Sequence, residues 1–328
     1  MFVMTSYIEI GKYLVKPSAV KYRRSVTNYI DSCTISLPKL LYVKTNDLNA
    51  TVDLKEAKPA DLFKEGDKVW VELGYNNKTG LRFTGFIKVI NYTDKLDIEC
   101  EGYSYLLPKE FNASYSSTTV KKILQDLTKG TEIQVSSKIP DVAVKNVRFK
   151  NASGRQVLEW IQKEIHLSVF FDFERLYAGF RYGLKNDKKP VKLRINWNTV
   201  EDKNFKKRTI DKNLQIKLVD KNSKGEVKKI KSDEKRYSQT QEIKVKSGIA
   251  DSILKLIAND MQAQKNYQGY EGTLTAFLEP VINTSDVVQV IDAKYPEREG
   301  LFFVETIEGK YDSGGGRQTV TLNYYYAN

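Results

Sequence analysis

The chain has 328 residues, 41% of them hydrophobic and 29% charged, with a formal net charge of +12. This balance is that of a globular protein and excludes a disordered or low-complexity chain, and the length allows two or three domains. Two cysteines and one histidine are too few for a disulfide framework or for a zinc site of the usual Cys and His spacing.

The excess positive charge is concentrated in one stretch. Residues 185–236 carry 18 Lys and Arg against 8 Asp and Glu. A localised basic surface favours an acidic partner, which is a nucleic acid, another protein or a membrane surface. The alternative interpretation is a set of solvated, Lys-rich loops that keep the protein soluble. Composition does not choose between the two.

The cysteines and the N-terminus indicate a reducing compartment. Cys33 and Cys100 are far apart in the sequence, and we expect buried thiols there. The opening residues MFVMTSYIEIGKYLVK lack the uninterrupted apolar core of a signal peptide. No stretch approaches the ~18 apolar residues of a membrane span. We therefore expect a soluble protein, made in the cytoplasm, with no membrane span.

The first hundred residues predict β-strands. The segments VTNYIDSCTISL, KVWVELGY, LRFTGFIKVINY and KLDIECEGY mix β-branched and aromatic residues with alternating polarity. In KVWVELGY, Val69, Val71 and Leu73 fall on one face, and Trp70 and Glu72 fall on the other. Turn sequences separate the segments. Short strands at this spacing are typical of an antiparallel sandwich or barrel.

After Pro108 the pattern predicts a small α/β module over residues 109–185. One helix follows Ser117 and Thr118, and a second follows Ser153. A strand, EIQV, lies between them, and the hairpin SVFFDF and LYAGFRYG ends the module. The helices are predicted from apolar residues at helical spacing, namely Val120, Ile123, Leu124 and Leu127 in the first, and Val157, Leu158, Ile161 and Ile165 in the second.

From Val191 strands resume, with the Lys-rich loops between them, and one helix interrupts them over about residues 248–264. Ser247 is its expected N-cap. The strands TLTAFL, VVQVID, GLFFVETIEGKY and RQTVTLNYYY follow, and the glycines at 314–316 are expected at a hairpin tip. The helix is predicted to bury one apolar stripe, formed by Ile249, Ile253, Leu256, Ile257 and Met261.

Two stretches of the chain follow the same plan. An offset of 219 places Asp67 on Asp286, Val69 on Val288 and Val71 on Val290. An offset of 220 matches the next strand, with Phe83 on Phe303 and Ile87 on Ile307. Each copy then continues with a turn and a final strand. We interpret the pattern as a duplicated β domain, and two such domains in one chain can occupy quasi-equivalent positions in a ring.

The order of these segments resembles the baseplate hub proteins of contractile-tailed phages. LFKEGDKVWVELGYNNKTGLRFTGFIKVI and LDIECEGYSYLL are similar to the opening domain of the late-control D family and of Mu-like phage hubs. TTVKKILQDLTKG, EIQV and SGRQVLEWIQKEI are similar to the middle module of that family. The helix at 248–264, with VVQVID and GLFFVETIEGKYD, is similar to its second barrel. The hub part of type VI secretion spike proteins is related.

The resemblance implies a mainly β fold with an α/β insert. Residues 1–108 are then a first tube-like antiparallel β-barrel, 109–185 the α/β module, and 186–328 a second tube-like barrel with one helix and the Lys-rich loops. Three chains would form a pseudo-sixfold ring under the tail tube. The second copy departs from the family because it reads Asn283-Thr284-Ser285-Asp286, without a Gly-Asp turn.

The resemblance also implies the partners. A homotrimer would join the hexameric tail tube to a threefold spike and contact other baseplate proteins. DNA or a tape-measure protein would pass through its lumen. The chain ends at LNYYYAN, so the spike is expected to be a separate chain. The expected location is the virion tail baseplate, or a related contractile particle, after assembly in the host bacterial cytoplasm. Phage and tailocin are not distinguished.

Two sets of residues are candidates for contacts in such a ring. The strands that contain Val69, Val71, Val288 and Val290 are expected to line equivalent walls. The basic cluster Lys206, Lys207 and Arg208 is expected to contact acidic neighbours in the baseplate.

The sequence gives no catalytic constellation. His166 follows a predicted helix, where a capping or core role is expected, and no Gly-x-Ser-x-Gly elbow occurs. We therefore expect no enzyme activity, no catalytic or metal-binding residues and no cofactor.

The competing interpretation is a β-barrel protein that binds single-stranded nucleic acid. Such proteins combine a basic groove with exposed aromatic rings for base stacking. Residues 185–236 supply the charge, and Trp197, Phe205 and Tyr237 lie near or within them.

Overall fold

The computed structural model places most of the chain in two compact units. The first comprises residues 1–105, 188–205 and 272–328, and the second comprises 106–187 and 206–271. The division into 1–108, 109–185 and 186–328 stays a prediction. The structure describes residues 3–38, 41–42, 44–45, 56–57, 62–92, 96–181, 189–202, 204–208, 214–221, 227–233, 235, 237–245 and 248–325.

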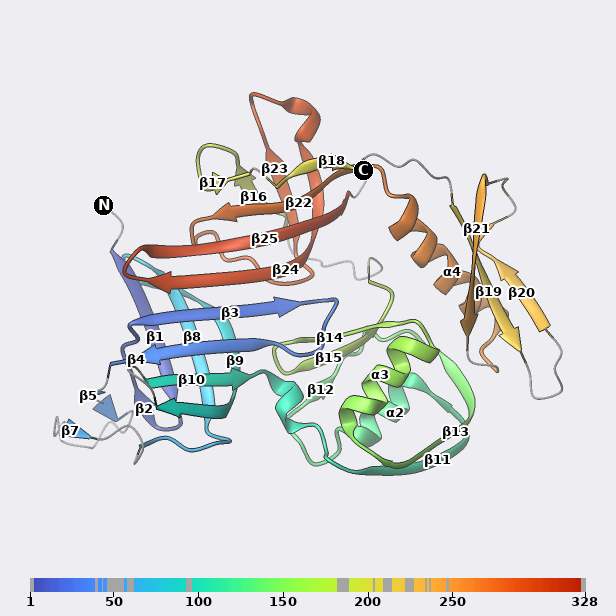
Figure 1. Cartoon of the computed structure of the whole chain (residues 1–328), viewed down its shortest axis with the longest axis horizontal. Coiled ribbons are helices and arrows are strands. Elements are labelled where there is room, and N and C mark those ends of the chain that lie inside the picture. The colour runs from blue at the N-terminus through green and yellow to red at the C-terminus, as the bar shows by residue number, and fades with distance from the viewer. Residues whose placement is uncertain are drawn as a thin grey trace. The chain divides into compact units, whose positions relative to one another are not determined.

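A large, mainly antiparallel sheet forms the first unit, and it confirms the predicted mainly β fold (Figure 1). Its central order is β25-β24-β3-β4-β10-β9-β8-β1, with β22 next to β25 and β23 next to β24. The strands are β1 (Met4–Ile10), β2 (Tyr13–Leu14), β3 (Ala19–Ser25), β4 (Ser32–Leu37), β6 (Lys44–Thr45), β8 (Lys68–Tyr75), β9 (Lys78–Tyr92), β10 (Leu96–Glu101), β16 (Val191–Arg194), β17 (Thr199–Glu201), β22 (Gly269–Ala276), β23 (Val287–Ile291), β24 (Gly300–Asp312) and β25 (Gly315–Tyr325). A small separate pair is formed by β5 (Leu41–Tyr42) and β7 (Glu56–Ala57).

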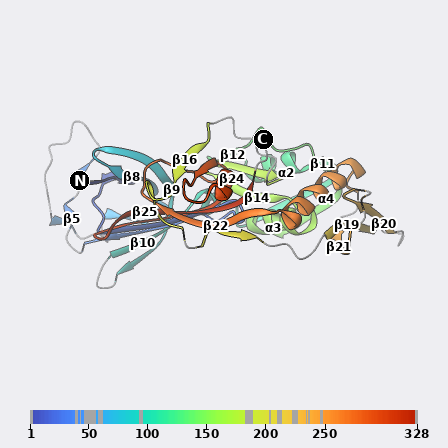
Figure 2. The same cartoon turned by 90° about the horizontal axis from the view of Figure 1, so that it is seen from above.

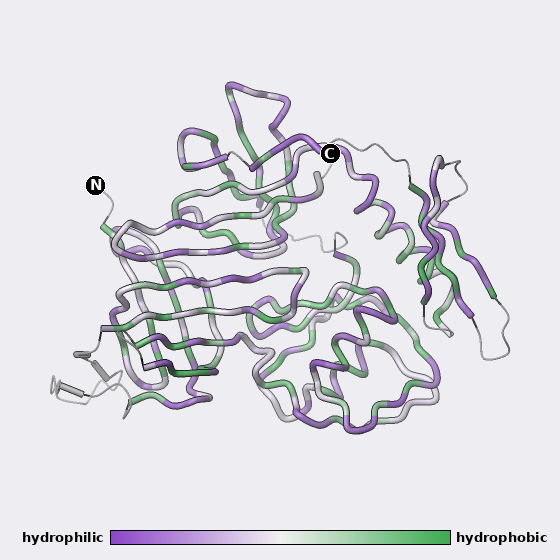
Figure 3. Tube along the Cα trace, in the orientation of Figure 1, coloured by the Kyte–Doolittle hydropathy of each residue, from purple (hydrophilic) through white to green (hydrophobic). Residues whose placement is uncertain are grey.

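Alternation of polarity decides which face of each strand is buried. In β8 the side chains of Val69, Val71 and Leu73 are fully buried, whereas Trp70 is exposed. Hydrophobic and hydrophilic residues alternate along many of the strands (Figure 3). Burial of such a side chain contributes about 1.5–3 kcal/mol, so the period of two fixes the register of these strands.

The two copies of the predicted repeat begin with the same turn. The Asp67 carboxylate accepts a hydrogen bond from the Lys64 amide (3.0 Å), and the Asp286 carboxylate accepts one from the Asn283 amide (2.8 Å). Gly66 has φ +88° and Ser285 has φ +66°. The second copy therefore lacks the Gly-Asp sequence but keeps the turn, with a serine in the left-handed conformation.

Strand pairing corrects the alignment of the next strand. Val69 lies opposite Gly85, and Val288 lies opposite Phe302. The offset between β9 and β24 is therefore 217, and the offset of 220 is wrong. Ile90, not Ile87, corresponds to Ile307.

A shared irregularity confirms the corrected offset. Where β9 pairs with β10, Lys88 has no residue opposite it, and where β24 pairs with β25, Glu305 has none. These two bulged residues correspond at the same offset of 217. Two copies with the same turn and the same bulge support one duplicated strand set, and a bulge is a feature that related structures retain.

The second unit contains three helices and several small sheets in its described residues. The helices are α2 (Val120–Leu127), α3 (Gly154–Glu164) and α4 (Asp251–Asn266). Two short 3-10 helices of the chain are η1 (Tyr103–Leu106) and η2 (Pro296–Arg298). The strands of this unit, besides the start of β22, are β11 (Phe111–Thr119), β12 (Gln134–Val135), β13 (Ala143–Ala152), β14 (Ser168–Asp172), β15 (Arg175–Gly179), β18 (Lys206–Arg208), β19 (Leu214–Lys221), β20 (Val227–Lys231) and β21 (Gln239–Val245).

The first two helices follow the sequence pattern. The apolar residues predicted for each helix are all buried. Thr119, rather than Ser117 or Thr118, caps α2 by accepting a hydrogen bond from the Lys122 amide. Ser153 caps α3 in a capping box with Gln156, as an N-terminal serine with Gln at N3 predicts.

The third helix differs from its prediction. It begins at Asp251, and its N-cap Ala250 makes no side-chain cap; Ser247 lies outside the described residues. Leu256 is 48% exposed. The buried face consists of Leu254, Ile257, Ala258 and Gln262, because α4 packs on β19 and β20. Two views show α4 beside the sheet of β19, β20 and β21 (Figures 1 and 2).

Candidate functional site

The four candidate valines occupy matching places in the two copies. Val69 and Val71 lie on β8, which pairs with β9, and Val288 and Val290 lie on β23, which pairs with β24. All four side chains are fully buried. They belong to the core of each copy, and a role of their strands as walls of a ring stays a prediction.

The two copies are joined edge to edge by β3 and β24. Their antiparallel register places Arg23, Arg24 and Ser25 opposite Glu308, Ile307 and Thr306. Arg23 forms an ion pair with Glu308 at 2.9 Å, and the hydroxyls of Ser25 and Thr306 are 2.7 Å apart. We call this pairing the β3–β24 joint. It makes one continuous sheet from two strand sets.

The joint buries an arginine. The Arg24 Nε donates to Asp31 at 3.3 Å, and its Nη1 donates to the Asn283 side chain at 3.2 Å. Arg24 is thus held by a residue of each copy. Arg24 lies on the same face of β3 as the buried Val20 and Tyr22, so the period of two indicates that it points inward, although it is not among the sequence candidates.

A second buried arginine, Arg82, also joins the copies. Its guanidinium donates to the carbonyls of Leu73 and Leu278 and, at 3.4 Å, to the Gln318 side chain. Gln318 in turn donates to the carbonyls of Phe277 (2.8 Å) and Pro280 (2.7 Å). A buried charge of this kind is tolerated only with such partners. No sequence signal identified Arg82, since its strand is buried on both faces there.

The face of the joint is polar and hollowed. A cavity of about 530 Å³ lies over β3, β4, β24 and β25. Its charged lining residues are Lys21, Arg23, Glu201, Glu308, Lys310 and Arg317. Four cations against two carboxylates give this hollow a positive charge balance.

The structure separates the three residues of the basic cluster. Lys206 and Lys207 are exposed on β18. Arg208 forms an ion pair with Glu271 at 3.1 Å and donates to the carbonyls of Gln264 and Lys265 at the end of α4. Arg208 therefore satisfies helix-end carbonyls, and the contact of the basic cluster with acidic neighbours stays a prediction.

Part of the remaining positive charge is paired inside the same region. Lys229 lies 2.7 Å from Glu242, and Lys228 forms an ion pair with Asp251. The hydrogen bond from Lys229 lowers the pKa of Glu242. These exposed pairs reduce the free basic surface that the composition indicated.

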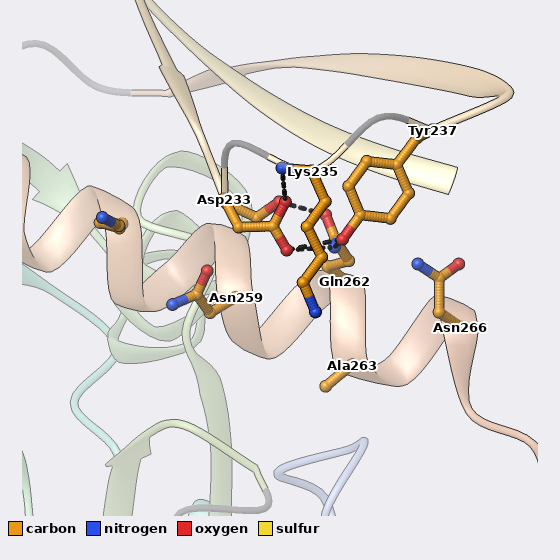
Figure 4. A pocket seen from close by; sticks show the side chains of 9 residues that line it. Asp233, Lys235, Tyr237, Asn259, Gln262, Ala263 and Asn266 are labelled. Carbon is orange, nitrogen blue, oxygen red and sulfur yellow. Dashed lines mark hydrogen bonds between the residues drawn. The ribbon is translucent and has the colours of Figure 1, made fainter. Parts of the chain in front are cut away.

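A polar pocket of about 710 Å³ in the second unit is lined by residues of α4 and by Ser232, Asp233, Lys235 and Tyr237 (Figure 4). The Tyr237 hydroxyl donates to Asp233 at 2.6 Å, and the Gln262 amide donates to the Tyr237 oxygen at 2.6 Å. The hydrogen bond from Tyr237 lowers the pKa of Asp233 and raises that of Tyr237. Gln262 also accepts from the Ile216 amide at 3.1 Å. These hydrogen bonds attach Asp233 and Tyr237 to Gln262 of α4.

The aromatic residues considered for base stacking differ in exposure. Trp197 is 79% exposed. Phe205 is buried, with its ring 5.2 Å from that of Phe302, and Tyr237 is held in the pocket network. Burial therefore keeps the Phe205 ring from stacking on a base.

The histidine and the cysteines are in structural positions. His166 has φ +59°, and its Nε2 lies 2.7 Å from the Lys244 carbonyl. The Leu167 amide donates to the Ile161 carbonyl, which is the bond that closes a helix C-terminus. Cys33 and Cys100 are buried and lie opposite each other on β4 and β10 as free thiols. Burial raises the pKa of both thiols.

Two kinds of feature are absent from the part of the chain that the structure describes. No group of three or more His, Cys, Asp or Glu in the described residues could hold a metal ion. No helix in the same residues has the length and apolarity needed to cross a membrane.

Comparison with known proteins gives similarity in structure only. No family model matches the chain, and no curated protein matches it. A tail protein of Neisseria meningitidis MC58 matches with a TM-score of 0.68 and 13% identity, over 98% of this chain and 97% of that chain. The 43 kDa tail protein of prophage MuSo2 from Shewanella oneidensis matches with a TM-score of 0.61 and 14% identity, over 97% of each chain.

A third similar structure comes from a secretion system. It is an Escherichia coli protein described as a component of the type VI secretion system with structural similarity to the phage T4 tail proteins gp27 and gp5. Its TM-score is 0.55 at 11% identity, over 98% of this chain and 79% of that chain. The chain thus shares its fold, over nearly its whole length, with tail proteins and with a secretion component.

Proposed function

We propose that the chain is the structural hub of a contractile tail or injection-device baseplate. It forms a homotrimer whose six strand sets make a pseudo-sixfold ring. The ring adapts the hexameric tail tube to a threefold spike supplied by a separate chain. The shared fold with phage tail proteins and with a type VI secretion component supports this role.

The observation that carries the proposal is the β3–β24 joint. It connects two strand sets with the same turn and the same bulge, edge to edge, in one sheet. A chain that contains two similar strand sets joined in this manner supplies two of the six positions of a ring. Three chains would then have the threefold symmetry of the spike, and their six strand sets would approximate the sixfold symmetry of the tail tube.

The three predicted segments keep distinct roles in this proposal. Residues 1–108 and 186–328 supply the two tube-like domains, and 109–185 supplies the α/β module. Tail tube, spike and other baseplate proteins are the partners, and the strands of Val69, Val71, Val288 and Val290 form walls of the ring. DNA or a tape-measure protein passes through the lumen, and the role requires no catalysis.

The test is electron microscopy of the purified chain, alone and with the spike protein of the same particle. We expect rings with three large subunits and six similar inner densities, and a complex with one spike trimer per ring. Particles that remain single subunits in both samples would overturn the proposal. The tail tube protein serves as a second partner, expected on the opposite face of the ring.

A further inference from the structure

One edge of β9 is open where its counterpart in β24 is filled. In β24, Thr306–Gly309 pair with β25 on one side and with β3 on the other. The corresponding residues Val89–Tyr92 of β9 pair with β10 on one side. On the other side β8 pairs only as far as Phe86, and no strand of the described chain follows it.

Exposure follows this difference. Ile307 is 2% exposed under β3, whereas its counterpart Ile90 is only half-buried. Val89 is half-buried too, whereas Thr306 is buried. An open edge with half-exposed branched side chains is the kind of edge that accepts another strand.

The complementary edge is found by the same correspondence. In the first copy Ile98 lies between Ile90 and Ile35. In the second copy Val320 lies between Ile307 and Leu274. Strand β22 is therefore the counterpart of β4.

The counterpart of β3 is found by counting three residues back from the matched residues of β4 and β22. This step leads from Ile35 to Ser32 and from Leu274 to Glu271. Arg23 lies opposite Ser32, and Lys206 lies opposite Glu271. Strand β18 is thus the counterpart of β3, with Lys206 in the place of Arg23. No strand in the described residues pairs with the other edge of β18.

We propose that β18 of one chain pairs, antiparallel, with β9 of a second copy of this chain. The register repeats the β3–β24 joint. It places Lys206 opposite Asn91, Lys207 opposite Ile90 and Arg208 opposite Val89. This proposal rests on the proposed ring and names its intersubunit surface, and the pairing requires no third protein.

A second copy is the occupant because the chain itself shows which kind of strand fits this edge. The strand that fills the corresponding edge of β24 is β3, the counterpart of β18. Among the strands that the structure describes, β9 and β18 of each chain each keep an unpaired edge. Head-to-tail pairing uses both, and closure of the ring leaves neither edge open.

The correspondence ends at Tyr92. Its counterpart Gly309 lies under the Tyr22 ring, where an added Cβ would come within 1.8 Å of the ring. Tyr92 is 57% exposed and cannot occupy the same space. The proposed pairing therefore spans three residue pairs, and the Tyr92 ring lies outside it.

Crosslinking of paired cysteines tests the register in the full-length chain. The variant carries Asn91→Cys and Lys206→Cys, and a short bis-maleimide joins thiols that lie close together. The native Cys33 and Cys100 are buried, so the wild-type chain is the negative control for the maleimide reaction. Opposite residues of an antiparallel pair have Cβ atoms about 4.5–5.5 Å apart, so the new thiols are within reach.

The control pair is Glu99→Cys with Lys206→Cys. Glu99 is exposed on β10 and accepts a hydrogen bond from Asn91 at 2.7 Å, so both variants lose the same surface contact. In the proposed register Glu99 is one strand farther from Lys206. We expect intermolecular crosslinks in the test pair at least tenfold above the control, with a mass-spectrometric crosslink between residues 91 and 206.

The other outcomes separate the two proposals. A trimer whose test pair crosslinks no better than the control would overturn the proposed pairing and leave the hub proposal in place. A monomer without crosslinks would also overturn the pairing, because the pairing needs only identical chains. The hub proposal would then depend on whether the spike protein brings three chains together.

Discussion

At the scale of single residues, buried polar groups link the two copies within the first unit. Arg24 and Arg82 each contact residues of both copies. Non-polar side chains would allow many arrangements of two similar sheets. Two buried guanidinium groups accept only the arrangement that supplies their acceptors.

Removal of the Arg82 charge tests this role. In Arg82→Met the Gln318 side chain and the carbonyls of Leu73 and Leu278 lose a buried donor. We expect the free energy of unfolding to fall by about 1–3 kcal/mol, because buried acceptors are left without a donor, and urea denaturation measures this change. The exposed Arg23→Met is the control, with a change within about 0.5 kcal/mol. A change below about 1 kcal/mol in Arg82→Met would show that the network contributes little.

The pocket network predicts a dependence on pH. Hydrogen bonds to the charged carboxylate hold the folded-state pKa of Asp233 below its ordinary value. Its contribution to stability is therefore present above about pH 4, the unfolded pKa. It is lost as pH falls through the folded pKa.

Comparison of the wild type with Asp233→Asn measures this effect. The difference in free energy of unfolding is expected to be constant between pH 5 and 7 and to shrink below pH 4. Tyr237→Phe, which removes the main donor to Asp233, should weaken the dependence. A difference that stays constant down to pH 2 would show that the network does not act on the carboxylate.

At the scale of elements, the Lys64–Asp67 and Asn283–Asp286 turns provide a matched experiment. Gly66 and Ser285 both have positive φ, a conformation that costs a residue with a Cβ roughly 1–2 kcal/mol. A Cβ at Gly66 would meet only ordinary contact, with the Tyr105 hydroxyl 3.5 Å away. We expect Gly66→Ser to lower and Ser285→Gly to raise the free energy of unfolding, each by about 1 kcal/mol. Changes of the same sign would contradict equivalence of the turns.

The elements also show how far sequence reasoning extends. Helices α2 and α3 were predicted with their buried residues because their apolar spacing is regular and local caps mark their starts. The Leu256 prediction was wrong because α4 packs against β19 and β20, and nothing local to α4 specifies this face. The offset of 220 was wrong because pairing register, set in part by a bulge, determines which residues correspond.

The joint itself was beyond prediction from the pattern. Ser25 and Thr306 are 281 residues apart, and alternation states only which face of a strand is buried, not which strand lies beside it. The candidate valines were identified by the repeat and lie in matching places. The buried Arg82 and Gln262 were missed because a charged or amide residue in a buried row carries no sign of its partners.

At the scale of the whole molecule, the two lysines of the basic cluster are expected to contact acidic neighbours in the baseplate. Lys206→Glu with Lys207→Glu leaves Arg208 and its helix-end contacts in place. We expect the variant to keep its stability in the single chain within about 0.5 kcal/mol, because both lysines are exposed there. Its recovery in assembled tails should fall at least tenfold.

Reversal of Lys129 and Lys150, which are exposed elsewhere in the second unit, is the matched control of equal charge change. Normal recovery of the Lys206 and Lys207 variant in tails would contradict a role of these lysines in assembly. Equal loss in both variants would assign the effect to net charge alone.

The most direct test of the central claim is the mass of the full-length protein in solution, measured by light scattering at low and moderate salt. We expect three times the chain mass of 37.7 kDa, either for the protein alone or after addition of its spike protein, and little dependence on salt. A chain that stays monomeric in both samples and binds single-stranded DNA with a steep salt dependence would contradict the hub and support the nucleic-acid alternative.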